Sequence, residues 1–120
     1  MASPHHKQPT AFLNHGGGPL PILDDPGHAS LSKSIRQFAQ SLSVAPVAVV
    51  LVTAHWLEKN GPGVTSAANP KLLFDYYGFP SQAYTLTYNA PGDPALAARV
   101  AGLLQGAGEN AKAAFVSHAL

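Results

Sequence analysis

The segment Val47–Thr53, with the sequence VAVVLVT, is the feature that most constrains how this chain can fold. It is rich in β-branched residues, which favour an extended backbone. A strand with one face in water alternates apolar and polar residues, but this segment is apolar at every position before Thr53. We therefore expect a central strand covered on both faces, as in a parallel sheet with helices on either side.

Around this segment the chain alternates short extended stretches with helical ones. Apolar residues within Ala29–Leu42 recur near the helical period, and Asp93 followed by Pro94 is typical of a helix start. The expected elements are strands at Thr10–Asn14, Val47–Thr53, Gly63–Ser66 and Lys112–Val116, and helices at Ala29–Leu42 and from Ala95 to about Gln105. This order predicts the α/β class, with a mostly parallel sheet flanked by helices.

The two ends and one internal stretch complete the domain organisation. Residues 1–9 are polar and contain prolines, which predicts a disordered leader, and residues 10–120 are predicted to form part of one α/β domain. The stretch Asn69–Pro94 contains three prolines after Pro70 and all four tyrosines of the chain. A loop of this length is usually functional, or it indicates that an element within it has been missed.

Composition excludes several kinds of function. The 120 residues include no cysteine, so disulfides, thiolate metal sites and cysteine nucleophiles are excluded. Only 11% of residues are charged, the net charge is +1 and no basic stripe is present, which argues against nucleic acid as a partner. The longest apolar stretch, Val44–Ala54, is too short to span a bilayer, and the N-terminus lacks the apolar core of a signal peptide. We expect a cytoplasmic protein with no membrane partner.

Two histidines directly follow the first two predicted strands. His15 comes after AFLN and His55 after VVLVTA. In open α/β sheets ligands bind beyond the carboxyl ends of the strands, so parallel neighbours would bring both rings to one edge. Two neutral imidazoles at one edge can share a metal ion. The alternative is that each histidine is an ordinary hydrogen-bonded loop residue, and the spacing leaves both interpretations open.

The segment after His15 raises further alternatives. HGGG forms an oxyanion hole in some esterases, but this chain has no G-x-S-x-G nucleophile motif, which argues against that chemistry. Asp24 and Asp25 form a possible carboxylate pair, although Asp before Pro-Gly more often caps a turn. His28 either lines a pocket or, as we favour, is a solvated histidine at the start of a helix.

Several of these stretches together resemble a known family. FLNHGGGPLPILDDPGHASL, the AHW that follows the apolar strand, and FDYYGFP are similar to the N-terminal half of the class III extradiol ring-cleavage dioxygenases. The similarity is greatest to the DOPA 4,5-dioxygenase-like branch of the LigB superfamily, and it covers about residues 10–105. It implies a metal-dependent enzyme that opens a catechol-type ring with O2.

The resemblance also implies roles for particular residues. His15 and His55 would be the first two protein ligands of non-heme Fe2+, with Zn2+ in some relatives. Tyr76, Tyr77 and Phe79 would form a wall of the substrate pocket, with Tyr76 or Tyr77 stacking on or hydrogen bonding the aromatic ring. The alternative for these aromatic residues is a loop that packs over the core.

The chain also departs from the family pattern. Family members are much longer, and their third metal ligand and acid/base histidine come from the C-terminal half. His118 lacks the expected flanking Asp and Gly, so we assign it no such role. We therefore expect an incomplete fold and weak or absent activity from the chain alone. The alternative is a non-catalytic association or regulatory module that forms homo- or hetero-oligomers through an exposed sheet edge.

Overall fold

The computed structural model describes residues 8–108, 112–114 and 118–119. The chain divides into two compact units, Met1–Val49 and Val50–Leu120, and each is described by itself. The predicted disordered leader, residues 1–9, lies outside the described residues except for its last two positions. Within the part of the chain that the structure describes, neither long helix has the length and apolar character needed to cross a membrane.

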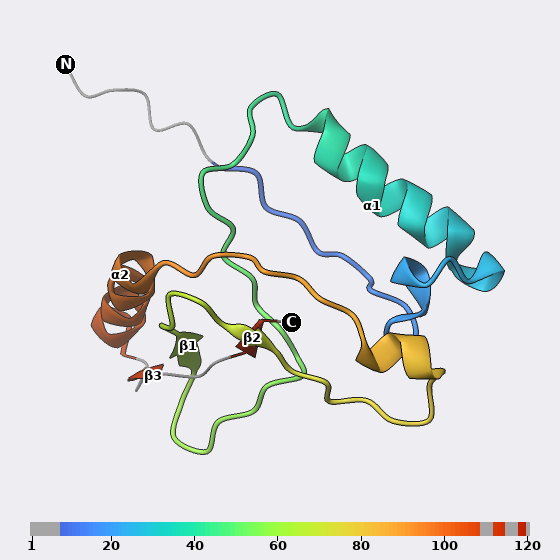
Figure 1. Cartoon of the computed structure of the whole chain (residues 1–120). Helices are drawn as coiled ribbons and strands as arrows, with labels where there is room; N and C mark the ends of the chain where they lie inside the picture. The colour runs from blue at the N-terminus through green and yellow to red at the C-terminus, as the bar shows by residue number, and fades with distance from the viewer. Residues whose placement is uncertain (1–7, 109–111, 115–117, 120) are drawn as a thin grey trace. The chain divides into compact units, whose positions relative to one another are not determined.

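The first unit contains the helix α1, Ala29–Ser41, and two short 3-10 helices before it (Figure 1). These are η1, Leu20–Ile22, and η2, Pro26–His28, and both contact α1. The Ser32 hydroxyl donates a 2.7 Å hydrogen bond to the carbonyl oxygen of Pro21, which ties α1 to η1. The predicted helix is confirmed, because the apolar period that indicated it places half-buried side chains along one face.

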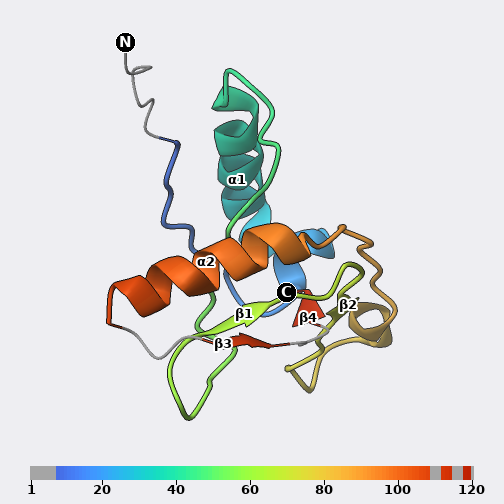
Figure 2. The same ribbon diagram turned by 90° about the vertical axis from the view of Figure 1, so that its left-hand side faces the viewer.

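The second unit is built around a parallel strand pair and a helix. Strand β1, Gly63–Thr65, pairs in parallel with β3, Lys112–Ala114, in the register Gly63↔Lys112. Helix α2, Pro94–Gly106, contacts both strands and lies over them (Figure 2). Parallel neighbours need a crossover connection, and α2 lies on it, which makes a βαβ-type arrangement. The buried residues Ala97 and Ala101 are small enough for close packing of the helix.

The predictions for these elements are largely confirmed. Helix α2 begins at Pro94, and the Asp93 side chain accepts a 2.9 Å hydrogen bond from the backbone N–H of Leu96, as an N-cap does. The strand predicted at Gly63–Ser66 is β1, and the first three residues of the strand predicted at Lys112–Val116 are β3. Positions 115 and 116 of that prediction lie outside the described residues.

The predicted long loop Asn69–Pro94 contains short elements of its own. Strand β2, Lys71–Leu72, pairs in parallel with β4, His118–Ala119, and a 3-10 helix, η3, covers Ser81–Tyr84. The backbone N–H of Gly92 donates a 2.9 Å hydrogen bond to the carbonyl oxygen of Ala68. Ala68 directly precedes the stretch and Gly92 lies near its end, so this bond closes the stretch into a loop within the second unit.

Two strand predictions are wrong in this structure. Neither Thr10–Asn14 nor Val47–Thr53 forms a strand, and Val47 and Val52 are fully or almost fully exposed. A strand is stabilised by a neighbour that pairs with its N–H and C=O groups, and no described segment pairs with either stretch. The described strands form two separate parallel pairs, so the mostly parallel sheet flanked by helices stays a prediction.

Candidate functional site

In the first unit, the two backbone N–H groups that follow His15 are both hydrogen bonded to side chains. The Asn14 side-chain oxygen accepts a 2.9 Å hydrogen bond from the backbone N–H of Gly16. The next N–H along the chain, that of Gly17, donates to Nε2 of His28 at 3.1 Å. The first bond closes an Asx-type turn around His15, and the second ties the turn to the start of α1. The backbone directly after His15 is therefore held by two side chains.

His28 joins this loop to a carboxylate. Its Nδ1 lies 2.7 Å from Oδ2 of Asp25, and the two side chains are only 23% and 33% exposed. Since Nε2 accepts the hydrogen bond from Gly17 and Nδ1 faces the carboxylate, these contacts correspond to the tautomer that carries its proton on Nδ1. The expectation of a solvated His28 is wrong. Asp25 holds the N-cap position of η2, as expected for a residue that caps the turn, but its carboxylate bonds the imidazole instead of a backbone N–H.

Gly16 meets a requirement that no other residue type satisfies easily. Its φ of 73° lies in the left-handed region, which L-residues with a Cβ avoid. A Cβ built at this position would lie 2.7 Å from Cδ2 of His28 and 2.8 Å from Cδ2 of Leu31. The glycine after His15 therefore lets the chain turn sharply and lets the His28 ring pack against the loop.

In the second unit, the ring of His55 is hydrogen bonded to a carboxylate. Its Nδ1 lies 2.6 Å from Oδ2 of Asp75, and its backbone N–H donates to the Thr53 hydroxyl at 3.1 Å. The carboxylate only accepts, so the proton of this bond is on Nδ1, and Nε2 is the ring nitrogen suited to a metal. A carboxylate that orients a histidine in this way is typical of metal centres.

The sequence prediction missed the role of Asp75. There this residue is only one letter of the motif FDYYGFP, with no role of its own. One signal was present, because Asp75 is the only carboxylate between Glu58 and Asp93. That signal could not identify His55 as the partner, because the two residues are 20 positions apart and only the fold brings them together.

His15 and His55 belong to different units, so a metal shared between them stays a prediction. Among the residues that the structure describes, no group of three or more His, Cys, Asp or Glu side chains is arranged to bind a metal ion. In the first unit the structure shows a held backbone next to His15, and in the second unit it shows a His55 ring that is oriented by Asp75.

Tyr76 and Phe79 belong to an aromatic cluster with Phe74 and Tyr84. The ring centroid of Tyr76 lies 5.3 Å from that of Phe79, 5.4 Å from that of Tyr84 and 5.9 Å from that of Phe74. The Tyr76 hydroxyl donates a 2.6 Å hydrogen bond to the carbonyl oxygen of Ala83, a fully buried residue. Burial, followed by the nearby Tyr84 and Asp75, raises the pKa of Tyr76 above its ordinary value of 10.0.

The three residues predicted to bind substrate therefore lie in two different environments. Tyr76 and Phe79 pack within the cluster, which gives weight to the alternative that these aromatics cover the core. The Tyr77 side chain between them is 91% exposed and points to no partner in the cluster. Of the three, Tyr77 has the side chain that can contact a ligand without local rearrangement.

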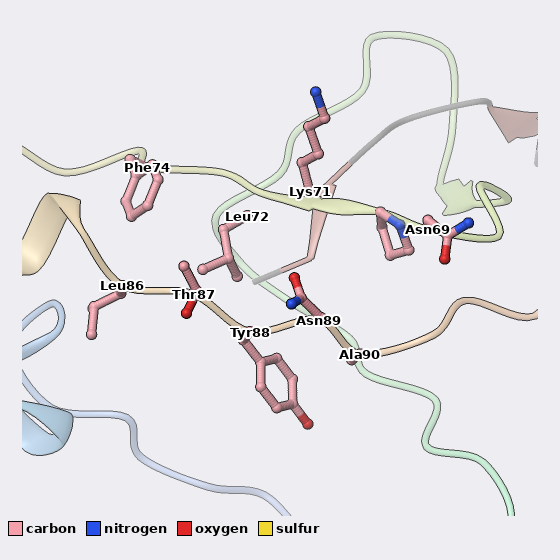
Figure 3. A pocket seen from close by; sticks show the side chains of 10 residues that line it. Asn69, Lys71, Leu72, Phe74, Leu86, Thr87, Tyr88, Asn89 and Ala90 are labelled. Atoms are coloured by element: carbon pink, nitrogen blue, oxygen red, sulfur yellow. The ribbon is translucent and has the colours of Figure 1, made fainter.

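An open pocket of about 500 Å³ lies beside this cluster in the second unit. Figure 3 shows it between two extended segments, with Leu72 and Thr87 facing each other across it. Its lining combines apolar side chains with amide and hydroxyl groups and includes neither His55 nor Asp75. The lining residues are Asn69, Pro70, Lys71, Leu72, Phe74, Leu86, Thr87, Tyr88, Asn89 and Ala90.

Comparison with known proteins adds information that the geometry does not contain. The chain is 45% identical over 106 residues to a dioxygenase, tasH, of Hapsidospora irregularis. It is 39% identical over 98 residues to a 4,5-DOPA dioxygenase extradiol of Escherichia coli, strain K12, and 34% identical over 113 residues to one of Beta vulgaris. These matches cover 83%, 82% and 90% of this chain.

The same matches cover a smaller share of each relative. They span 32%, 34% and 39% of the three proteins, so the chain spans about a third of the length of the curated relatives it matches. No family model matches the chain, and no solved structure matches it significantly. The similarity to extradiol dioxygenases that the motifs predicted is confirmed by these relatives.

Proposed function

This chain is homologous to the extradiol dioxygenases over most of its length, and on that premise we propose that it belongs to a metal-dependent enzyme that opens a catechol-type ring with O2. The name 4,5-DOPA dioxygenase extradiol describes relatives that act on a DOPA ring. A catechol-type small molecule and O2 are accordingly the proposed substrates. The predicted cytoplasmic location rests on the sequence alone.

The observation that carries the proposal is the 2.6 Å contact between Nδ1 of His55 and the Asp75 carboxylate. A histidine ligand usually donates its second ring N–H to a carboxylate, which fixes the tautomer and makes the binding nitrogen more basic. His55 has this arrangement, and at 44% exposure its ring is within reach of an ion. An oriented imidazole of this kind supports Fe2+ as the proposed metal, and the same donor chemistry also suits Zn2+.

The proposal gives His15 the role of a second ligand. The structure fixes its backbone through Asn14 and through the Gly17–His28 bond, as a ligand on a loop needs. His15 and His55 would hold the divalent ion through two nitrogen ligands, which leaves positions open, and the ion would supply a centre at which the catechol oxygens and O2 can bind. The protein's own contribution would be to hold the backbone next to His15 and to orient the His55 ring through Asp75.

The aromatic segment supplies the proposed substrate wall. Tyr76 and Phe79 pack edge to face, so they form a rigid surface and not a flexible flap. The Tyr76 hydroxyl is occupied by Ala83, so this residue contributes its ring and not its hydroxyl. The exposed Tyr77 is the proposed residue for stacking on or hydrogen bonding the substrate ring.

Anaerobic titration with Fe2+ tests the metal proposal. His55→Ala and His15→Ala should each abolish most of the binding. Asp75→Asn removes the charge that supports His55 and should weaken binding about tenfold, at the lower end of the range for such supporting groups. Glu58→Gln is the matched control. It also removes one carboxylate charge, and its amide oxygen can still accept the 2.9 Å hydrogen bond from Nε1 of Trp56.

The Fe2+ affinities of the variants decide whether the two histidines bind the metal. Binding that is lost in both histidine variants, weakened in Asp75→Asn and unchanged in Glu58→Gln supports the proposal. Equal binding by wild type and both histidine variants would exclude these rings as ligands. Oxygen uptake with DOPA should be small for the 120-residue chain, because two imidazoles are fewer protein ligands than a tightly held catalytic metal usually has.

One observation favours the second candidate function, a non-catalytic association module. The apolar segment predicted as a central strand is exposed, with Val49, Leu51 and Val52 at 75%, 66% and 92%. Contiguous exposed apolar residues of this kind commonly mark a protein–protein contact. Light scattering tests it, because association through this segment gives a mass above 12.4 kDa that Leu51→Asp and Val52→Asp return to the monomer value.

A further inference from the structure

We propose that His28 is a positioning residue that holds the loop carrying His15 in its ligand-binding conformation. This inference rests on the proposed role of His15 as a metal ligand. His28 touches no proposed ligand in the described contacts, and it acts through the backbone of the glycine segment. Neither the sequence pattern nor the comparisons assign it a role.

A chain of two hydrogen bonds carries the argument. Asp25 accepts from Nδ1 of His28 at 2.7 Å, and Nε2 of the same ring accepts from the N–H of Gly17 at 3.1 Å. The carboxylate thus keeps the proton on Nδ1 and leaves Nε2 able to accept. An N–H two residues after His15 is in this way tied to the start of α1.

Packing adds to the hydrogen bonds. The His28 ring lies so close to Gly16 that a Cβ there would be 2.7 Å from Cδ2 of the imidazole. The ring therefore contacts the loop with a carbon edge at Gly16 and with a nitrogen at Gly17. On the other side of His15, the Asn14 side chain accepts from Gly16. These contacts together restrict the backbone conformation of the segment that carries His15.

Imidazole is well suited to this position because one neutral ring both donates and accepts. Lysine and arginine only donate, and a carboxylate at position 28 would face Asp25 with a like charge. Two isosteric variants divide the functions of the ring. In His28→Gln the side-chain oxygen can take the place of Nε2 and accept from Gly17. In His28→Asn the shorter amide can take the place of Nδ1 and donate to Asp25, but it does not reach Gly17.

The first test is spectroscopic and needs no metal. Nitrogen-15 NMR of the 120-residue chain should show the His28 ring protonated at Nδ1 and unprotonated at Nε2. The Gly17 amide proton should shift on His28→Asn and stay near its wild-type position on His28→Gln. An Nε2-protonated ring, or a Gly17 signal that is the same in both variants, would overturn the proposal.

The second test measures the affinity for Zn2+ by calorimetry, since zinc does not oxidise in air. His28→Asn should weaken binding about tenfold, and His28→Gln should restore most of that loss, as expected for a group outside the ligand set. Asp24→Asn, which removes the neighbouring carboxylate but no bond to the ring, should bind as wild type does. A merely structural role would lower the stability of both His28 variants without this difference in affinity.

The outcomes distinguish this inference from the proposed function. If the wild-type chain binds no Zn2+, the proposed metal site is wrong and the inference fails with it. If the wild type binds, His15→Ala does not bind, and His28→Asn binds as tightly as wild type, only the inference about His28 is wrong. Weaker binding in His28→Asn together with restored binding in His28→Gln supports both.

Discussion

Substitution of Gly16 by alanine should destabilise the first unit more than the volume of one added methyl group would suggest. The φ of 73° costs an L-residue about 1–2 kcal/mol, because its Cβ meets the neighbouring carbonyl. The new methyl group would also lie 2.7 Å from the His28 ring and 2.8 Å from Leu31. The ring cannot easily turn away, since both its nitrogens are hydrogen bonded. Overpacking of this kind costs about 1–3 kcal/mol, which gives a total of about 2–5 kcal/mol.

Gly78→Ala provides a matched control. Gly78 has nearly the same dihedral angle, with φ of 77°, but a Cβ there meets no atom within 4 Å. It should therefore lose only the conformational part, about 1–2 kcal/mol. The difference between the two variants isolates the contact with His28 and Leu31, and it should be about 1–3 kcal/mol.

Amide hydrogen exchange is the suitable assay, because it reports on each compact unit separately. Amides of α1 report on Gly16→Ala, and amides of α2 report on Gly78→Ala. A difference of about 1–3 kcal/mol corresponds to about 5–150-fold in the loss of protection. If Gly16→Ala lowers protection no more than Gly78→Ala does, the close packing of the loop against His28 is refuted.

Three further predictions concern the second unit. Gly92→Ala should lower the free energy of unfolding, measured with denaturant, by about 2–4 kcal/mol, because the new Cβ would overlap the Ala67 carbonyl oxygen and disturb the hydrogen bond from Gly92 N–H. The control is Gly102→Ala, at a helix position with open space, which should raise the free energy of unfolding by about 0.5–1 kcal/mol. Asp93→Ala should cost about 1 kcal/mol by removing the N-cap of α2, and unchanged helix stability by circular dichroism would contradict the cap. Because the pKa of Tyr76 is raised in the folded state, the folded protein keeps the phenol proton at a pH where the unfolded chain, with a pKa of 10.0, loses it. The contribution of Tyr76 to stability is therefore complete below pH 10.0 and is lost as the pH rises through the pKa of the folded state. Tyr76→Phe should remove the phenolate absorbance that develops last in an alkaline titration, and an unchanged last phase would show that another tyrosine is the protected one.

The sequence by itself was sufficient for features that depend on nearby residues. The apolar period within Ala29–Leu42 predicted α1, and Asp93 followed by Pro94 predicted where α2 begins. Both signals act within one or two helical turns, so they do not depend on distant parts of the chain. The sequence likewise indicated the extradiol dioxygenases through the motifs HGGGP, AHW and FDYYGFP. A motif is a run of neighbouring residues, so it can be recognised without knowledge of the fold.

Only the tertiary structure decided which distant groups meet. Asp75 pairs with His55, and the ring of His28 bonds Gly17, although a composition or a period gives no reason to join these residues. The same limit explains the failed prediction for Val47–Thr53, since apolar β-branched residues favour an extended backbone but a strand also needs a neighbour. Local preference is encoded within a few residues, whereas hydrogen-bond partners across the chain exist only after packing has brought their segments together.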